Sequence, residues 1–187
     1  MKKVLVLAFI VMVLCAFNSA RADLVVNGGF ETGDWTCWTT VPASSGSSFL
    51  VDGVLPHSGS YAAALGSIYT DDTIYQYLTT TPGQSYSFSF WLEKQESRSS
   101  TFSDFHAYWN GTEVLTLINV ANFGYTEYSY TVQATTASTL IKFAGTEPPG
   151  RFNLDDVHVN PVPIPGALLL LGPGLVGLTA VRKRLKK

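Results

Sequence analysis

The segment SYSFSFWLE, residues 85–93, decides the fold class of this 187-residue chain. Every second residue from Tyr86 to Leu92 is large and apolar, and small polar residues fill most of the places between them. A period of two predicts a β-strand that buries one of its faces. Pro82-Gly83, just before it, favours a turn, so the segment is predicted to pair antiparallel with residues 74–79.

Further turn signals follow along the chain. Asn110-Gly111 predicts a tight hairpin between residues 105–109 and 113–117, because a type I′ turn needs two positive φ angles. Short strands at this spacing, with no convincing helical pattern in residues 23–160, predict an all-β domain, an antiparallel jelly-roll β-sandwich. The other strands are predicted at residues 23–27, 125–133, 139–144 and 152–159.

Residues 1–22 are predicted to be a secretory signal peptide. They combine a short basic start, an apolar run over residues 4–17, and the small residues Ala20 and Ala22 before a cleavage point at Asp23. The alternative is an uncleaved membrane helix, although the apolar run is short for a membrane span.

The other end of the chain, residues 161–187, is predicted to be a tail with a single transmembrane helix. Its apolar stretch, residues 166–181, reaches about 24 Å at ~1.5 Å per residue, against roughly 30 Å for a bilayer core. The basic end, residues 182–187, is expected to hold the C-terminus in the cytoplasm while residues 23–160 stay outside. Its cations are Arg182, Lys183, Arg184, Lys186 and Lys187.

A proline motif, Val162, Pro163, Ile164 and Pro165, precedes this apolar stretch and its basic end. In this order the three parts resemble the PEP-CTERM sorting signal of Gram-negative bacteria, although Ile164 stands where that family most often has Glu. The resemblance implies an exported protein, held in the inner membrane with its domain outside, which an exosortase-type sorting enzyme processes to the cell surface or extracellular matrix. The alternative is an ordinary stop-transfer anchor.

The predicted sandwich is strongly acidic. Residues 23–160 hold all 14 acidic residues of the chain and only four of its 12 basic residues, a formal charge of −10. This balance argues against nucleic acid as a partner, because phosphate binding needs clustered cations. Cys15 lies in the signal peptide, so Cys37 would be the single cysteine after cleavage and is expected to be a small buried hydrophobe.

Three short motifs mark the start, the middle and the end of the predicted sandwich. They are VNGGFETG at residues 26–33 with Trp38 shortly after it, HSGSYA at 57–62, and FNLDDV at 152–157. Together they resemble the corresponding motifs of jelly-roll carbohydrate-binding modules in the galactose-binding-like fold. The resemblance implies that the first and last strands lie side by side.

The same resemblance implies a structural Ca²⁺. Its side-chain ligands would be Glu31 and one of Asp155 or Asp156, with carbonyl groups from Gly29 and from the Ser58-Gly59 turn. Oxygen ligands suit this hard cation, and two adjacent acids on one strand otherwise repel each other. The alternative is that Glu31 and Asp156 hydrogen-bond neighbouring backbone or face water.

Catalytic groups do not stand out in the sequence. His57, His106 and His158 are scattered, and the numerous Ser and Asp residues select neither a nucleophile nor a carboxylate pair. We therefore expect a protein that is not an enzyme. The alternative is a small secreted hydrolase whose reactive groups meet only in the fold.

The excess of aromatic residues favours carbohydrate binding, because sugar rings stack on flat side chains while polar neighbours bind their hydroxyl groups. Trp91 lies in the polar phase of its strand and is expected to face outward. His106 and Tyr108 share the phase opposite to Phe105 and Trp109, so one of these two pairs is expected to face outward.

Tyr75 and Tyr69 are further candidates for ligand contact, whereas Trp35 and Trp38 are expected to pack in the core. The prediction is a non-enzymatic surface or matrix protein that binds polysaccharide or neighbouring surface material. The alternative is a purely structural or interaction module without glycan binding, since a sandwich core also needs large side chains.

Overall fold

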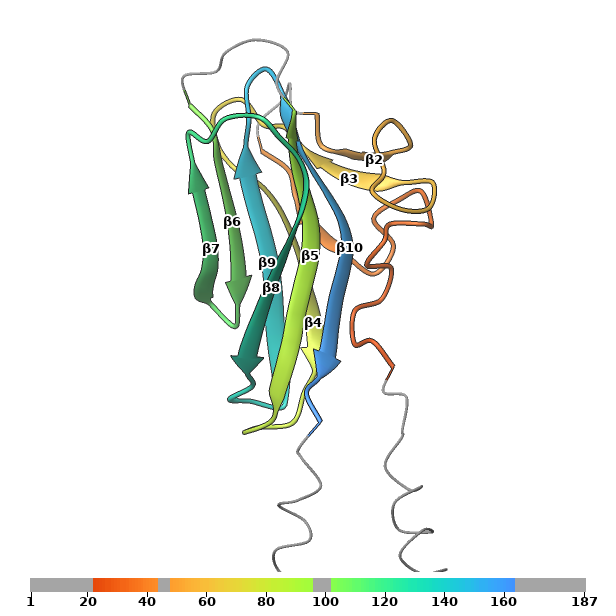
Figure 1. Ribbon diagram of the computed structural model, residues 1–187, viewed down its shortest axis with the longest axis vertical. Coiled ribbons are helices and arrows are strands. Elements are labelled where there is room, and N and C mark those ends of the chain that lie inside the picture. The colour runs from red at the N-terminus through yellow and green to blue at the C-terminus, as the bar shows by residue number, and fades with distance from the viewer. Residues whose placement is uncertain (1–21, 44–47, 96–101, 164–187) are drawn as a thin grey trace, which may run out of the picture. The chain divides into compact units, whose positions relative to one another are not determined.

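The computed structural model describes residues 22–43, 48–95 and 102–163 (Figure 1). Residues Ala22–Pro161 form one compact unit. All ten strands assigned in the described residues belong to this unit, so its fold can be followed on its own.

Most of the two predicted targeting segments lies outside the described residues. This holds for residues 1–21, for Ile164 and Pro165 of the proline motif, and for the apolar stretch and basic end behind them. Val162 and Pro163 are described and directly follow the last strand. Within the described part of the chain, no helix is long and apolar enough to cross a membrane.

The strands form two five-stranded antiparallel sheets, as the predicted β-sandwich requires (Figure 1). In spatial order, sheet A consists of β1 (Thr39–Val41), β4 (Asp72–Thr79), β9 (Ser138–Thr146), β6 (Asp104–Trp109) and β7 (Thr112–Ile118). In spatial order, sheet B consists of β2 (Leu50–Asp52), β3 (Ala62–Leu65), β10 (Arg151–Pro161), β5 (Ser85–Gln95) and β8 (Phe123–Gln133).

The strand predicted from the alternation in residues 85–93 is confirmed as β5, which turns its apolar face into the core. On β5, the apolar residues from Tyr86 to Leu92 are buried and the residues between them are partly exposed. Phe90 of sheet B meets Phe143 of sheet A with ring centroids 4.9 Å apart and planes nearly perpendicular. Burial of each such side chain contributes about 1.5–3 kcal/mol to the free energy of folding. Contacts such as that between Phe90 and Phe143 therefore hold the two sheets together.

The predicted hairpin between residues 74–79 and 85–93 is wrong. Both segments are strands, but β4 pairs with β1 and β9 in sheet A, whereas β5 pairs with β10 and β8 in sheet B. Each strand has an apolar face, and placing the two on opposite sides of one core buries both faces. The Pro82-Gly83 turn therefore crosses between the sheets, where the N–H of Gly83 donates to the carbonyl of Ala134 at 2.7 Å.

The hairpin predicted at Asn110-Gly111 is confirmed. β6 and β7 pair antiparallel around it, and the two turn residues have positive φ angles of 48° and 84°. The strands predicted at residues 125–133, 139–144 and 152–159 are confirmed as β8, β9 and β10.

The start of the domain differs from the prediction. Residues 23–27 form bends and no strand, but the N–H of Leu24 donates to the carbonyl of Val159 in β10 at 3.0 Å. The first segment thus lies beside the last strand, as the resemblance to the carbohydrate-binding modules implied. The strands β1, β2 and β3 have no counterpart in the sequence predictions, because three or four residues are too few for a period of two to show.

Three residues near the start of the domain, Trp35, Cys37 and Trp38, differ in burial. Trp38 is buried as expected and stacks on Phe30 with ring centroids 5.5 Å apart. Trp35 is only partly buried and stacks on Phe49 at 4.7 Å. Cys37 is exposed, so the prediction of a small buried hydrophobe is wrong. It has a φ angle of 69°, and this turn points its side chain outward while the next residue turns into the core.

Candidate functional site

The outer face of sheet A gathers three of the five predicted ligand-binding residues, Tyr75, His106 and Tyr108. The strand register places Tyr75 of β4 opposite Lys142 of β9, and Lys142 opposite Tyr108 of β6. Directly opposed residues point to the same side of a sheet. Buried and partly exposed residues alternate along β4 and β6, so this row of side chains faces away from the core.

Rings and a cation make close contacts along this face. Tyr75 and Tyr77 meet edge to face with centroids 5.9 Å apart, and the side chain of Tyr77 is 66% exposed. The Nζ atom of Lys142 lies 3.9 Å above the ring centroid of Tyr108, and His106 stacks beside Tyr108 at 6.1 Å. We call these five residues, Tyr75, Tyr77, His106, Tyr108 and Lys142, the tyrosine face.

Charged and polar groups border the rings. Nδ1 of His106 lies 2.5 Å from Oε1 of Glu113 on β7. Hydrogen bonds from Thr116 and then from His106 lower the pKa of Glu113, so this carboxylate is ionised at neutral pH. Burial and then the negative charge of Glu113 raise the pKa of Tyr108, so its hydroxyl keeps the proton and can donate it in a hydrogen bond.

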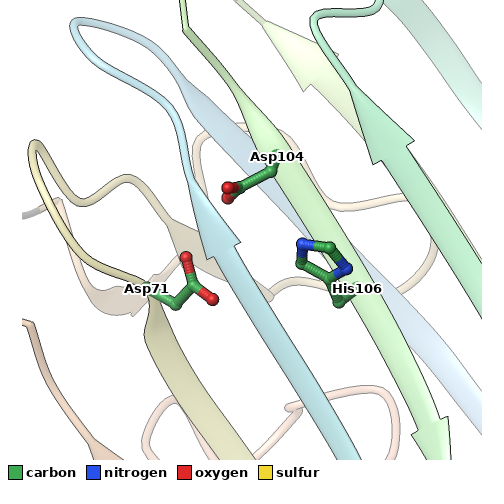
Figure 2. Close-up of side chains that lie close together, drawn as sticks. All are labelled: Asp71, Asp104 and His106. Carbon is green, nitrogen blue, oxygen red and sulfur yellow. The ribbon is translucent and has the colours of Figure 1, made fainter. Parts of the chain in front are cut away.

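Beyond His106, the same face ends in two carboxylates (Figure 2). Asp71 lies directly before β4, and Asp104 is the first residue of β6. Ligand atoms of Asp71, Asp104 and His106 all lie within 4.8 Å of one another. Sequence reasoning singled out His106 and missed the two aspartates. Asp104 and His106 stand two residues apart on a predicted strand, and this spacing could have indicated a shared face.

Trp91 lies on the outer face of sheet B, so the structure does not bring it together with the tyrosine face. Its indole stacks on the ring of His57, with centroids 3.9 Å apart and planes 15° apart. The hydroxyl of Tyr125 donates to the carbonyl of Leu55 at 2.6 Å. The segment around His57 therefore packs on sheet B and covers one side of the indole. A ligand contact by Trp91 stays a prediction.

Two of the predicted calcium ligands, Asp155 and Asp156, hold this segment on the sheet. Oδ2 of Asp155 accepts the backbone N–H groups of His57 at 2.8 Å and of Ser58 at 3.1 Å. Asp156 accepts the hydroxyl of Ser58 at 2.8 Å and lies 2.7 Å from Nδ1 of His57. Burial raises the pKa of Asp155 to about 6, and the N–H groups that bond to it offset part of this effect.

Glu31, the third predicted calcium ligand, holds the residues that follow. Its carboxylate accepts the N–H of Ser60 at 2.9 Å and of Tyr61 at 3.1 Å. Both oxygens of Glu31, of Asp155 and of Asp156 accept a hydrogen bond. Three carboxylates offer the oxygen ligands that calcium prefers, but the ion would displace some of these donors. A structural calcium stays a prediction.

Ser58, His57 and Asp156 meet, but not in the order that nucleophilic catalysis needs. The serine hydroxyl and Nδ1 of the histidine both bond to the aspartate. In a catalytic arrangement the base has to bond to the nucleophile in order to take its proton. This group therefore serves to hold the segment on sheet B.

Comparison with known proteins relates the fold to carbohydrate-binding modules. No protein-family model matches the chain, and no curated protein matches it either. A family 61 module, TmCBM61, solved in complex with β-1,4-galactotriose, is 16% identical with a TM-score of 0.55 and covers 75% of this chain and 99% of its own. The CBM22-1 xylan-binding domain of Xyn10C from Paenibacillus barcinonensis is 14% identical with a TM-score of 0.54, covering 78% and 98%.

The enzymatically active domain of tailspike protein 4 from bacteriophage CBA120 is also similar. It is 15% identical with a TM-score of 0.55, and the match covers 75% of this chain but only 21% of the tailspike chain. At these identities the likeness shows the fold alone: the domain is a jelly-roll sandwich like that of carbohydrate-binding modules.

Proposed function

We propose that residues 22–161 form a non-catalytic module that binds polysaccharide on its tyrosine face. The observation that carries the proposal is the outward row of Tyr75, Lys142 and Tyr108 across three neighbouring strands, extended by the exposed ring of Tyr77. The fold supports it, because the similar modules include one solved with β-1,4-galactotriose and one described as xylan-binding.

The chemistry of this face suits a sugar chain. The C–H faces of sugar rings stack on exposed aromatic side chains, and the hydroxyl of Tyr108, the ammonium of Lys142 and the carboxylate of Glu113 supply donors and acceptors for sugar hydroxyls. Neighbouring strands lie ~4.8 Å apart, so Tyr75 and Tyr108, with β9 between them, are separated by roughly 10 Å. The two rings can therefore contact different sugar units of one chain.

Affinity electrophoresis in gels that contain galactan, xylan or other polysaccharides tests this proposal. We expect the wild-type protein to be retarded by at least one polysaccharide. Tyr108→Ala and Tyr77→Ala should each weaken the retardation about tenfold or more, because each removes a ring from the face without opening the core. Circular dichroism of each variant checks that the sandwich is intact.

Trp91→Ala serves as the comparison variant. The proposal places the ligand on sheet A and departs from the predicted contact at Trp91, whose indole lies on the other sheet. Loss of this indole should therefore leave retardation unchanged. Loss of binding in Trp91→Ala together with normal binding in Tyr108→Ala and Tyr77→Ala would place the ligand on sheet B and contradict the proposal.

We infer that the whole chain is an exported surface or matrix protein. The order of a signal-like start, an acidic domain and a PEP-CTERM-like tail in the sequence supports it. The inner membrane and an exosortase-type enzyme would then be transient partners. Polysaccharide outside the cytoplasm would be the lasting partner.

A further inference from the structure

Two strands that do not pair with each other bring Asp71, Asp104 and His106 together. β4 and β6 flank β9 on its two sides, and the side chains approach each other across β9 (Figure 2). The register places Asp104 opposite Thr146 and His106 opposite Ala144 on β9, and Asp71 bonds to Thr146. Ala144 is small, so His106 can reach over β9, and Ala144 is only 3% exposed.

The spacing of the three side chains suits a single ion. One ligand atom from each lies within 4.8 Å of the others. A zinc ion at about 2.0–2.2 Å from nitrogen and oxygen ligands holds them roughly 3–4 Å apart. A small inward rotation of the side chains therefore closes the set around an ion.

Neighbouring groups fix the orientation of two of these side chains. Nδ1 of His106 is engaged by Glu113 at 2.5 Å, and the other ring nitrogen faces the two carboxylates (Figure 2). The hydroxyl of Thr146, a buried residue, donates to Oδ1 of Asp71 at 2.8 Å. A carboxylate on the far nitrogen of a histidine is a common second partner in metal sites, where it aims the ring at the ion.

The carboxylate of Asp104 supplies a second observation. Oδ1 of Asp104 is buried and has no hydrogen-bond partner among the described residues. A buried acceptor without a partner is costly. Asp71 and Asp104 also bring two carboxylates within 4.8 Å of each other, and like charges at this distance repel. A bound cation would satisfy the oxygen and remove the repulsion.

We propose that Asp71, Asp104 and His106 form a binding site for one divalent transition-metal ion of the Zn²⁺ kind. Imidazole together with carboxylates favours such ions over calcium, which prefers oxygen ligands alone. Three protein ligands leave at least one coordination position for water or another oxygen ligand. The site is separate from the predicted calcium ligands. It shares His106 with the tyrosine face, but binding of the ion does not require a glycan.

Isothermal titration with zinc chloride tests the site. The full chain is purified in a mild non-ionic detergent without a polyhistidine tag and is stripped of metal with EDTA. We expect one zinc ion per chain and a rise of the melting temperature with zinc. His106→Ala and Asp104→Asn should each weaken zinc binding at least tenfold. Glu113→Gln should weaken it by a smaller factor, because it acts through His106.

His158→Ala is the matched control. His158 also lies beside a carboxylate, Asp23 at 2.5 Å, but on β10 of the other sheet. Its loss should leave zinc binding unchanged. Calcium should not compete with zinc at the proposed site.

Asp104→Asn keeps the test decisive if His106→Ala fails to fold. The substitution is nearly isosteric and removes one of two negative charges that repel each other. Without metal, the variant should therefore melt at or above the temperature of the wild type. Zinc should then no longer raise its melting temperature. Absence of zinc binding by the wild type, or equal binding by the wild type, Asp104→Asn and His106→Ala, would overturn the proposal.

Discussion

Asp155 is a buried acid, and the fold favours its protonated, uncharged form. Its pKa in the folded protein is raised to about 6, whereas an unfolded aspartate titrates near 4. Between about pH 4 and pH 6 the folded state therefore binds more protons than the unfolded state. The stabilisation that this side chain provides is fully present below about pH 4 and is lost as the pH rises through about 6.

Asp155→Asn removes this titration while it keeps the size of the side chain. We expect the loss of unfolding free energy, relative to the wild type, to be larger at pH 4 than at pH 7. Urea denaturation at the two pH values, with EDTA present so that no cation contributes, measures the difference.

Asp34→Asn is a control with the opposite sign. Hydrogen bonds from Thr36 and Thr32 lower the pKa of Asp34, so its stabilisation is present above about pH 4 and is lost as the pH falls. Equal effects of Asp155→Asn at both pH values, or a larger effect at pH 7, would contradict the raised pKa of Asp155.

Side-chain directions could be predicted from the sequence wherever a strand is long enough to show its phase. The phase of β6 predicted that His106 and Tyr108 share one face, but it did not decide whether that face is the inner or the outer one. In the structure it is the outer face. Asp71 could not be predicted as a neighbour of Asp104. The two meet only because β4 and β6 both pair with β9, and no local pattern carries that information.

At the scale of elements, the segment of residues 57–61 depends on a close approach to Glu31. Gly59 has a φ angle of 61°, and a Cβ atom added there would lie 2.3 Å from Oε1 of Glu31. Gly59→Ala should therefore strain the backbone by about 1–2 kcal/mol and also push the carboxylate from its N–H partners, at a further cost of about 1–3 kcal/mol. Thermal or urea unfolding measures the sum.

Gly111→Ala provides the matched comparison for this prediction. Gly111 has a similar φ angle of 84°, but nothing lies within 4 Å of an added Cβ atom. It should cost only the backbone strain, about 1–2 kcal/mol. If Gly59→Ala destabilises no more than Gly111→Ala, Glu31 does not hold the 57–61 segment in solution.

The two turn signals show how far local sequence predicts pairing. Asn110-Gly111 allows both positive φ angles of a two-residue turn, which leaves the strands on its two sides little choice but to pair. Pro82-Gly83 bends the chain without requiring a hairpin. Which strands pair there is decided by the burial of apolar faces far apart in the sequence, so the strand positions were predictable and the crossing between sheets was not.

For the whole molecule, the distribution of charge is the main argument for export. Residues 23–160 contain all 14 acidic residues and four basic ones, and the other eight of the 12 basic residues lie in the two end segments. Cations next to an apolar stretch tend to stay on the cytoplasmic side. An acidic domain between two such ends is therefore expected to cross the inner membrane while both basic ends remain behind.

Intact-mass spectrometry of the protein from its native host tests this expectation. We expect the N-terminus at Asp23 and a C-terminus that lacks the basic end, because the signal peptide and the tail would each be cut after export. Ala22→Phe should retain the signal peptide, since cleavage needs a small residue at that position, and it should leave the zinc affinity of the folded domain unchanged. Recovery of the wild-type chain from the cytosol with Met1 and Lys187 both present would contradict export, and binding of polysaccharide outside the cell would then have no route.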